Sequence, residues 1–273
     1  MPHRTALTLT LPLLTLPLLL VGGCTPSNTD SDSPADTGAC DFSIDPCEAN
    51  AAWITTCDAY PSIQGALDAA GNGTTVHVCA GEHAESLHLS ADDHPNQHIN
   101  LNGEGSGTTT VRAAPFDTTA DGAAVREGMV LYNDGVELDI AGLTLTAGTG
   151  YEWSPDTANS DSFGGGAYLV DARLVMSDVI FTGNAARIGG AIYAERSDIK
   201  LTNSAIQANT SDAAAVYLSN SALQSVHSDW GVGAQDNSPH DILIAAVDDG
   251  GEVTADYEAD ASFTCSAQAC TDG

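Results

Sequence analysis

Histidine and carboxylate side chains gather in one acidic stretch of the chain, where five histidines fall between His77 and His98. Imidazole and carboxylate groups together are ligands that Zn²⁺ and Cu²⁺ favour in proteins. The candidate metal ligands are His77, His83 and His88. However, His77 and His88 alternate with Val and Leu, as the outward residues of β-strands do, so a surface position without metal also explains these two residues.

Tyrosines recur at one position of a repeated pattern, namely at Tyr132, Tyr168, Tyr193 and Tyr217. Each of them directly follows an apolar residue, so on a strand the four rings would point outward and form a row. Such a row of aromatic rings could bind a glycan or a partner protein. The alternative is that the rings stack on one another and stabilise the sheet.

A polar insertion at residues 149–163 carries two further aromatic residues, Tyr151 and Trp153. Long loops on solenoids often carry binding sites, and exposed aromatic side chains can stack on sugar rings. The alternative is that the insertion folds back over the flank of the coils. Tyr151 and Trp153 are therefore candidates for the same binding surface as the repeated tyrosines.

The elements that must position these residues are repeats. Residues 164–184 and 189–209 match end to end at an offset of 25, and residues 128–148 and 213–230 extend the match on either side. In each unit the apolar residues alternate in short runs separated by Gly, Asn, Asp and Ser, which predicts three short strands joined by turns. Stacked units of about two dozen residues predict an all-β fold, a right-handed parallel β-helix.

The same alignment predicts contacts between successive coils. Three arginines fall opposite acidic residues of a neighbouring unit: Arg173 opposite Asp198, Arg196 opposite Asp171, and Arg187 opposite Asp212. Adjacent strands lie about 4.8 Å apart, so we expect ion pairs between coils at these positions. Asn184 and Asn209 also align, and we expect them to form an asparagine ladder that satisfies backbone groups of the turns.

Two motifs carry a family resemblance: Gly-Gly-Ala-Ile-Tyr at 189–193 and Phe-Thr-Gly-Asn at 181–184. They resemble the repeat of polymorphic outer membrane proteins and, more broadly, the right-handed β-helix, pectin-lyase-like superfamily. Residues 61–83 are similar to the entry into such helices, with a short capping helix at about 61–70 before the first strand. The resemblance covers about residues 57–247 and implies the fold, whereas lyases, hydrolases, adhesins and structural proteins all share this fold.

The superfamily also supplies the catalytic alternative. Its polysaccharide lyases use an Arg or Lys as base, and the cations left over after the predicted ion pairs are Arg112, Arg126 and Lys200. A glycoside hydrolase needs two carboxylates, which so acidic a chain would supply by chance. The polygalacturonase pattern is not matched, because the sequence at 187–189 departs from it at the lysine.

The charge of the chain excludes one class of partner. The sequence has 37 Asp and Glu but seven Lys and Arg, a net charge of −30. Nucleic-acid binding needs clustered Lys and Arg, so we expect no nucleic-acid partner. The acidic residues are scattered rather than spaced as in a calcium-binding loop. We expect a monomer without a cofactor, with Ca²⁺ as the one open question.

The first 24 residues have the form of an export signal. A basic start and a Leu-rich apolar run end in Leu-Val-Gly-Gly before Cys24, which resembles the lipobox of bacterial lipoproteins. The resemblance implies that residues 1–23 are removed and that Cys24 is acylated. A transmembrane helix is the alternative, but the apolar run is short and broken by prolines. Residues 24–39 contain no large apolar side chain, which predicts a flexible tether.

Six cysteines remain after Cys24: Cys40, Cys47, Cys57, Cys79, Cys265 and Cys270. An even number in an exported chain favours disulfide bonds, although many pairings are open. Proximity in the sequence favours Cys40–Cys47, Cys57–Cys79 and Cys265–Cys270. These bonds would lie at the two ends of the solenoid.

These observations predict five parts, with a signal peptide at 1–23, the lipidated Cys24 and tether at 24–39, a disulfide-containing cap at 40–60, the β-helix at 61–264, and a disulfide-closed tail at 265–273. The functional interpretation is a non-catalytic outer-membrane lipoprotein, facing the periplasm or the cell surface. It would present its β-helix for adhesion, for glycan or partner binding, or for envelope structure. The alternative is a carbohydrate-active enzyme.

Overall fold

The computed structural model of the protein describes residues 45–114, 125–153, 161–245, 252–257, 261–266 and 269–272. The predicted signal peptide, Cys24, the tether and Cys40 lie outside the described residues. Within the described part, no helix is both long enough and apolar enough to cross a membrane.

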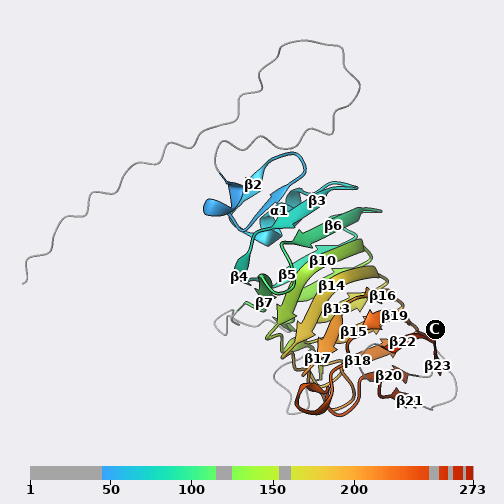
Figure 1. The fold of residues 1–273 in the computed structure, drawn as a ribbon. Helices are drawn as coiled ribbons and strands as arrows, with labels where there is room; N and C mark the ends of the chain where they lie inside the picture. The colour runs from blue at the N-terminus through green and yellow to red at the C-terminus, as the bar shows by residue number, and fades with distance from the viewer. Residues whose placement is uncertain are drawn as a thin grey trace, which may run out of the picture. The chain divides into compact units, whose positions relative to one another are not determined.

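Most of the described strands belong to two long sheets of a right-handed parallel β-helix (Figure 1). In the described part, sheet A has thirteen strands: β1 (Ala52–Ile54), β2 (Ala59–Tyr60), β3 (Thr75–Val78), β4 (Gly81–Ala84), β6 (His98–Gly103), β7 (Thr109–Arg112), β10 (Glu137–Thr146), β14 (Arg173–Thr182), β16 (Asp198–Thr202), β17 (Ala205–Gln207), β19 (Ala222–Ser228), β22 (Ala261–Ser266) and β23 (Ala269–Asp272). Sheet B has seven strands: β5 (Leu87–Ser90), β9 (Leu131–Asp134), β13 (Ala167–Val170), β15 (Ile192–Glu195), β18 (Val216–Ser219), β20 (Ile242–Ala245) and β21 (Glu252–Ala255).

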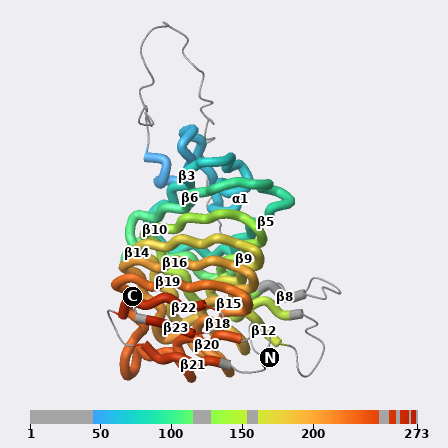
Figure 2. Tube along the Cα trace, turned by 90° about the vertical axis from the view of Figure 1, so that its right-hand side faces the viewer, coloured from blue at the N-terminus to red at the C-terminus, as the bar shows by residue number. Residues whose placement is uncertain are grey.

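Successive coils stack on one another (Figure 2), and their residues pair in the register that the repeat predicts. On sheet B, Tyr168 lies opposite Tyr132 on one side and Tyr193 on the other. On sheet A, Leu174 pairs with Leu138 and Ile199 in the same way. The inward residues of these strands are buried, and each buried Leu or Ile contributes roughly 2 kcal/mol relative to an exposed one. The predicted β-helix is confirmed.

The number of strands in each coil differs from the prediction. The second and third predicted strands are continuous in β10 and β14, which run for ten residues each. The chain bends within them at Gly142 and Asp178, where φ is 64° and 52°. In the next coil the corresponding residue, Asn203, interrupts the strand and separates β16 from β17. A left-handed residue therefore makes a bend without always ending the strand.

The chain enters the solenoid through the short helix α1 (Ile63–Ala69), which follows the 3-10 turn η1 (Pro46–Glu48) and strands β1 and β2. The carboxylate of Glu85 accepts hydrogen bonds from the first two amides of α1, those of Ile63 and Gln64, both at 3.0 Å. The side-chain amide of Gln64 then pairs with the backbone N–H and C=O of His88 on β5. Gln64 thus takes the place of a neighbouring strand at the open edge of sheet B, which is how the predicted capping helix protects that edge.

At the corners of successive coils, residues at equivalent positions have backbone angles in the left-handed region. Between sheets B and A these residues are Asp171, Arg196 and Asn220, with φ of 48°, 49° and 51°. At a second corner Ala147, Gly183 and Ala208 have φ of 60°, 64° and 54°. An L-residue with a Cβ is disfavoured there, so the two alanines are strained relative to glycine.

Replacing Ala208 by glycine should therefore raise the free energy of unfolding by about 0.5–1 kcal/mol, because relief of the Cβ clash exceeds the added chain entropy of the unfolded state. The denaturation midpoint in urea measures this change. Ala205→Gly in β17 is the matched control and should lower the midpoint, since Ala205 is not among the residues with positive φ. A lower midpoint for Ala208→Gly would contradict this account of the corner.

The C-terminal end of the solenoid differs from the expectation that coils continue through residues 231–264. Parallel stacking ends at β20, and β21 then pairs with β20 in the antiparallel sense. Strands β22 and β23 likewise add to β19 as antiparallel strands. Hairpins can close over a sheet end without a further coil, which ends the parallel stack.

The two described disulfide pairs lie at opposite ends of the β-helix. Cys265 and Cys270 are bonded as predicted. Cys47 is bonded to Cys79, so the predicted pairs Cys40–Cys47 and Cys57–Cys79 are wrong. Cys57 is also disulfide-bonded. The error arose because sequence proximity was used, whereas β1, which follows Cys47, pairs with β3 and brings Cys47 to the end of that strand.

Candidate functional site

The four repeated tyrosines form a continuous stack along sheet B, which we call the tyrosine ladder (Tyr132, Tyr168, Tyr193, Tyr217). Ring centroids of successive members are 5.7, 5.1 and 5.4 Å apart, and the planes of neighbouring rings differ by 10°, 6° and 6°. His88 continues the stack on Tyr132 at 4.5 Å. Each inner ring therefore has another ring against both of its faces.

The insertion covers part of this ladder. Together with β8 (Val125–Gly128), strands β11 (Gly150–Trp153) and β12 (Ser162–Phe163) form a small antiparallel sheet, sheet C. Tyr151 packs on Tyr168 at 5.0 Å and on Tyr132 at 6.2 Å. Phe163 lies edge-on to Tyr193 at 5.1 Å. The predicted polar loop is thus partly strand, and Tyr151 folds back over the coils. The side chain of Trp153 and residues 154–160 lie outside the described part.

This packing limits what the ladder can bind. A sugar ring stacks on the face of an aromatic ring, but the faces of Tyr168 and Tyr193 are occupied by their neighbours. The geometry therefore favours coil-to-coil stabilisation for these rings and leaves their edges as the part that a partner could contact. Aromatic pairs of this kind add about 0.5–1.5 kcal/mol each beyond simple burial.

Burial in the stack also changes the acidity of the phenols. Desolvation, assisted by the charges of Asp134 and Glu195, raises the pKa of Tyr132, Tyr168 and Tyr193 to about 12. A raised folded-state pKa contributes stability that is complete below the ordinary value of 10.0 and is lost as the pH rises through about 12. The ladder should therefore loosen only in strong alkali.

An absorbance titration of phenolate formation tests this expectation. In the native protein the three phenols should ionise near pH 12, and in denaturant they should ionise near pH 10. Tyr168→Phe keeps the ring stack and should reduce the amplitude of the high-pH step by a third. Native titration of all tyrosines near pH 10 would show that the ladder is solvated.

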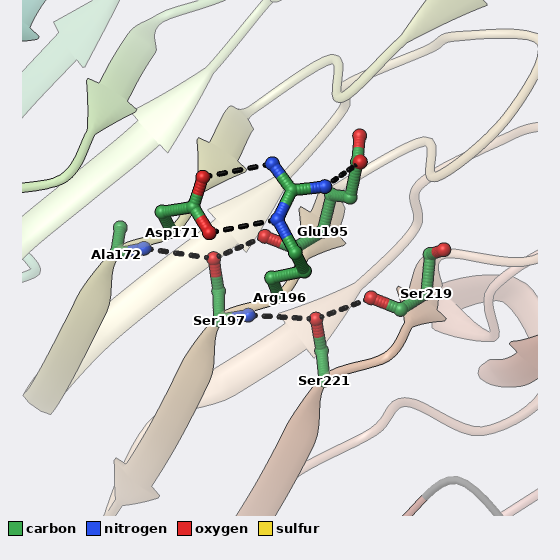
Figure 3. A network of polar contacts seen from close by, with 7 residues as sticks. All are labelled: Asp171, Ala172, Glu195, Arg196, Ser197, Ser219 and Ser221. Atoms are coloured by element: carbon green, nitrogen blue, oxygen red, sulfur yellow. Dashed lines mark hydrogen bonds and ion pairs between the residues drawn. The ribbon is translucent and has the colours of Figure 1, made fainter.

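The arginines of the coils are engaged in ion pairs. Arg196 binds Asp171 of the preceding coil with two hydrogen bonds, Nε to Oδ1 and Nη2 to Oδ2, both 2.7 Å long, and also binds Glu195 (Figure 3). These hydrogen bonds lower the pKa of Asp171. Arg187 bridges Asp161 and Asp212. The predicted pairs Arg196–Asp171 and Arg187–Asp212 are confirmed.

The third predicted ion pair, between Arg173 and Asp198, is not confirmed. Arg173 lies opposite Asp198 in the register, but its ion pair is with Glu137 of the preceding coil, at 3.9 Å. A strand has a neighbour on each side, and the alignment alone does not say which one a long side chain will reach. Arg112, which the sequence left without a partner, binds Glu82 at 2.5 Å. These pairs are largely exposed, so the surrounding water weakens them and they add little to stability.

Next to Arg196, serines at the same corner form hydrogen bonds from one coil to the next. The hydroxyl of Ser197 accepts from the amide of Ala172, and the hydroxyl of Ser221 accepts from the amide of Ser197, both at 3.0 Å (Figure 3). The two hydroxyls donate to the carbonyls of Glu195 and Ser219. This corner is therefore held by repeated side-chain hydrogen bonds as well as by the charge pair.

The histidines do not converge. His77 stacks on Trp53 at 3.8 Å, His83 is hydrogen-bonded to the carbonyl of Cys79 at 2.8 Å, and His88 stacks on Tyr132. Among the described residues, no three His, Cys, Asp or Glu side chains are placed to hold a metal ion. The structure places the three candidate ligands at three separate positions.

Two shallow hollows on the surface contain cationic side chains. The first, which we call the insertion groove, measures about 440 Å³ and is lined by Thr149, Ser162, Ala185, Ala186, Arg187, Thr210, Ser211 and Asp212. The second measures about 210 Å³ and lies over sheet A beside Arg173 and Lys200. Hydroxyl groups, a guanidinium and a carboxylate together make the insertion groove suited to a hydroxyl-rich ligand.

The asparagine ladder has a third member that sequence reasoning missed. Asn184, Asn209 and Asn237 are all buried, and each inner amide bonds to the next. Asn237 also donates to the carboxylate of Asp241, at 2.7 Å. The last step of the ladder is 28 residues rather than 25, so a search at the fixed offset passes over Asn237. A search for buried Asn at a tolerant spacing would have found it.

Asp241 makes the free energy of unfolding depend on pH. It is 2% exposed and also accepts a hydrogen bond from the amide of Tyr257, and burial raises its pKa to about 6, with Asp236 and Asp256 adding to the effect. Stability from a raised carboxyl pKa is complete below the ordinary value of 3.8 and is lost as the pH rises through about 6.

We therefore expect the free energy of unfolding to fall between pH 4 and pH 6 by more in the natural protein than in Asp241→Asn. Chemical denaturation at a series of pH values gives both slopes. Asp212→Asn, on the exposed surface, serves as the control and should keep the natural slope. Equal slopes for the natural protein and Asp241→Asn would contradict the assignment.

Comparison with known proteins finds a distant structural likeness. No family model matches the chain, and no curated protein matches it. Among solved structures it is similar to the pectin methylesterase PemA from Erwinia chrysanthemi, with 13% sequence identity and a TM-score of 0.35. The match covers 63% of this chain and 62% of that one, less than two thirds of either. A likeness this distant carries no argument about the fold or the activity of the chain.

Proposed function

We propose that the protein is a bacterial outer-membrane lipoprotein whose β-helix is a non-catalytic scaffold that binds a hydroxyl-rich partner, such as a glycan, at the insertion groove. In this proposal residues 1–23 are a signal peptide, Cys24 carries the lipid that anchors the chain, and residues 24–39 are the tether. The protein works as a monomer and has no nucleic-acid partner. The disulfides Cys47–Cys79 and Cys265–Cys270 support an exported, oxidising location.

The observation that carries the non-catalytic assignment is the pairing of four arginines in the described coils. A lyase base must be free to take a proton, whereas Arg112, Arg173, Arg187 and Arg196 each lie against a carboxylate. A paired guanidinium stays protonated and serves as a structural cation. The carbohydrate-active enzyme is the alternative outcome of the test below.

The insertion groove supports the binding part of the proposal. Thr149 and Thr210 are exposed and bring hydroxyl groups to the groove from separate coils. Arg187 and Asp212 add a fixed donor and acceptor beside them. Sugar hydroxyls both donate and accept, so a groove that offers both on a rigid scaffold fits such a ligand.

A binding and turnover assay separates the two functions. The full chain with Cys24→Ser is incubated with a panel of neutral and acidic polysaccharides, with and without Ca²⁺, and both binding and products are measured. We expect binding that Arg187→Ala with Thr210→Ala abolishes and that Arg112→Ala, outside the groove, retains. Shortened or unsaturated products would establish the enzyme instead, and absence of binding to every member would remove the glycan as the partner.

A separate experiment tests the anchor. Cells that express the natural chain should incorporate labelled fatty acid into the protein and retain it in the outer-membrane fraction, whereas Cys24→Ser should be unlabelled and soluble. Cys40→Ser is the matched control and should remain labelled. Label that persists in Cys24→Ser would place the lipid elsewhere.

A further inference from the structure

The tyrosine ladder holds phenol rings in an arrangement suited to a second kind of chemistry. Tyr193 lies 5.1 Å from Tyr168 and 5.4 Å from Tyr217, with ring planes within 6° of parallel in both cases. The three rings come from adjacent strands of one sheet in exact register, β13, β15 and β18. The rings of neighbouring tyrosines therefore lie face to face along the axis of the solenoid.

We propose that Tyr193 is an oxidative cross-linking site, at which a one-electron oxidant such as a peroxidase with hydrogen peroxide joins it to Tyr168 or Tyr217 as dityrosine. This proposal does not depend on the proposed function. It rests on the spacing of the rings, because two reactive groups that a rigid scaffold already holds in contact need no diffusion to meet.

Joining two tyrosines consumes one molecule of hydrogen peroxide. Each of two tyrosines gives one electron to the oxidant and one phenolic proton to water or to a nearby carboxylate, and each becomes a neutral phenoxyl radical. The two radicals form one carbon–carbon bond between ortho carbons. The hydrogen on each ortho carbon then moves to the phenol oxygen, so that dityrosine forms. Two tyrosines have lost two electrons and two protons, and hydrogen peroxide takes both to become two molecules of water.

Neighbouring groups favour this outcome over reaction with a second molecule. The charge of Glu195 acts on the phenols of both Tyr168 and Tyr193. Phe163 lies over Tyr193 and Tyr168, at 5.1 and 6.4 Å, which keeps another protein's ring from reaching them from that side. The net charge of −30 also opposes close contact between two copies.

A dityrosine here would join two coils that the described disulfides leave unlinked. Cys47–Cys79 and Cys265–Cys270 lie at the two ends of the solenoid, and the coils of the tyrosine ladder lie between them. A carbon–carbon bond, unlike a disulfide, survives a reducing environment. Oxidation of the tyrosine ladder would thus form a covalent bond between coils that reduction does not break.

Trypsin can report the cross-link directly. It cleaves after Arg187 and Arg196 and so releases Tyr193 in the peptide 188–196, while Tyr168 and Tyr217 leave in other peptides. The full chain with Cys24→Ser is treated with peroxidase and hydrogen peroxide at low concentration, and the monomer is isolated by gel filtration before digestion. We expect dityrosine fluorescence in the monomer. We also expect peptide 188–196 joined to a peptide that carries Tyr168 or Tyr217, at the summed mass less two hydrogen atoms.

Two variants and one condition decide the result. Tyr193→Phe keeps the stacked ring but lacks the phenol, so it should lose the joined peptide, whereas Tyr60→Phe, outside the ladder, should retain it. Oxidation in denaturant should also lose the specific link. The proposal is overturned if peptide 188–196 is joined only in dimers, if the same link forms equally well in denaturant, or if the native monomer is oxidised without it.

Discussion

Asn209→Ala should lower the free energy of unfolding by about 4 kcal/mol, the largest effect that we expect from a single side chain of the solenoid. The amide of Asn209 is fully buried and donates to the carbonyls of Phe181 and Gln207, both at 3.0 Å, and to Asn237 at 3.1 Å. Its oxygen accepts from the backbone and side chain of Asn184, both at 3.1 Å. Truncation removes a partner from groups on three coils.

The magnitude follows from the groups left without partners rather than from the bonds themselves. Each buried polar group that loses its partner costs about 1–3 kcal/mol. Denaturant titration of Asn209→Ala measures the loss. Gln207→Ala, which is partly exposed in the same segment, is the control and should change stability by less than about 0.5 kcal/mol. A loss below about 1 kcal/mol for Asn209→Ala would mean that the corner rearranges and satisfies these groups.

Gly165→Ala should lower the free energy of unfolding by about 3 kcal/mol or more, through a different cause. A Cβ at this position would lie 2.3 Å from the carbonyl oxygen of Gly190 in the next coil and 2.9 Å from the backbone N and O of Ala185. These are backbone atoms, so a side-chain rotation cannot relieve the clash and adjacent coils must separate.

The matched control for Gly165→Ala is Gly107→Ala. A Cβ at Gly107 meets no atom within 4 Å, and its φ is not positive, so this substitution should leave the unfolding midpoint unchanged or slightly raised. Thermal or chemical denaturation of both variants gives the comparison. Equal midpoints for the two variants would show that the coils next to Gly165 can move apart at little cost and make room for the Cβ.

Much of the fold was predictable because, in a repeat, equivalent residues of successive units lie opposite each other on neighbouring strands. When like residues recur at a constant offset, the stacking of Tyr168 on Tyr193 and of Leu174 on Ile199 follows from the alignment alone. The turns that the glycines predicted are also found, since Gly189 has a positive φ. These positions depend on local geometry that each coil repeats.

What could not be predicted lies where the repeat is broken. Phe163 lies in the insertion, just before the first aligned residue, and pairs with Ile188 of the next coil, but nothing in the alignment placed its ring against Tyr193. The partner of Cys47 depends on the antiparallel pairing of β1 with β3, before the first aligned unit. The antiparallel hairpins at the C-terminal end replace a coil with a different connection. Contacts of this kind are decided by tertiary packing, for which a single sequence carries no periodic signal.

The position of the disulfides affects the rate at which the protein unfolds. A solenoid in which each coil contacts mainly its neighbours loses coils most easily from its ends, where one neighbour is missing. Cys265 and Cys270 are only 5 residues apart, so their bond removes little entropy from the unfolded chain, yet it closes the terminal hairpin. Cys47–Cys79 closes the opposite end. Disulfide bonds at the ends where fraying begins slow unfolding, so they lengthen the lifetime of the folded protein.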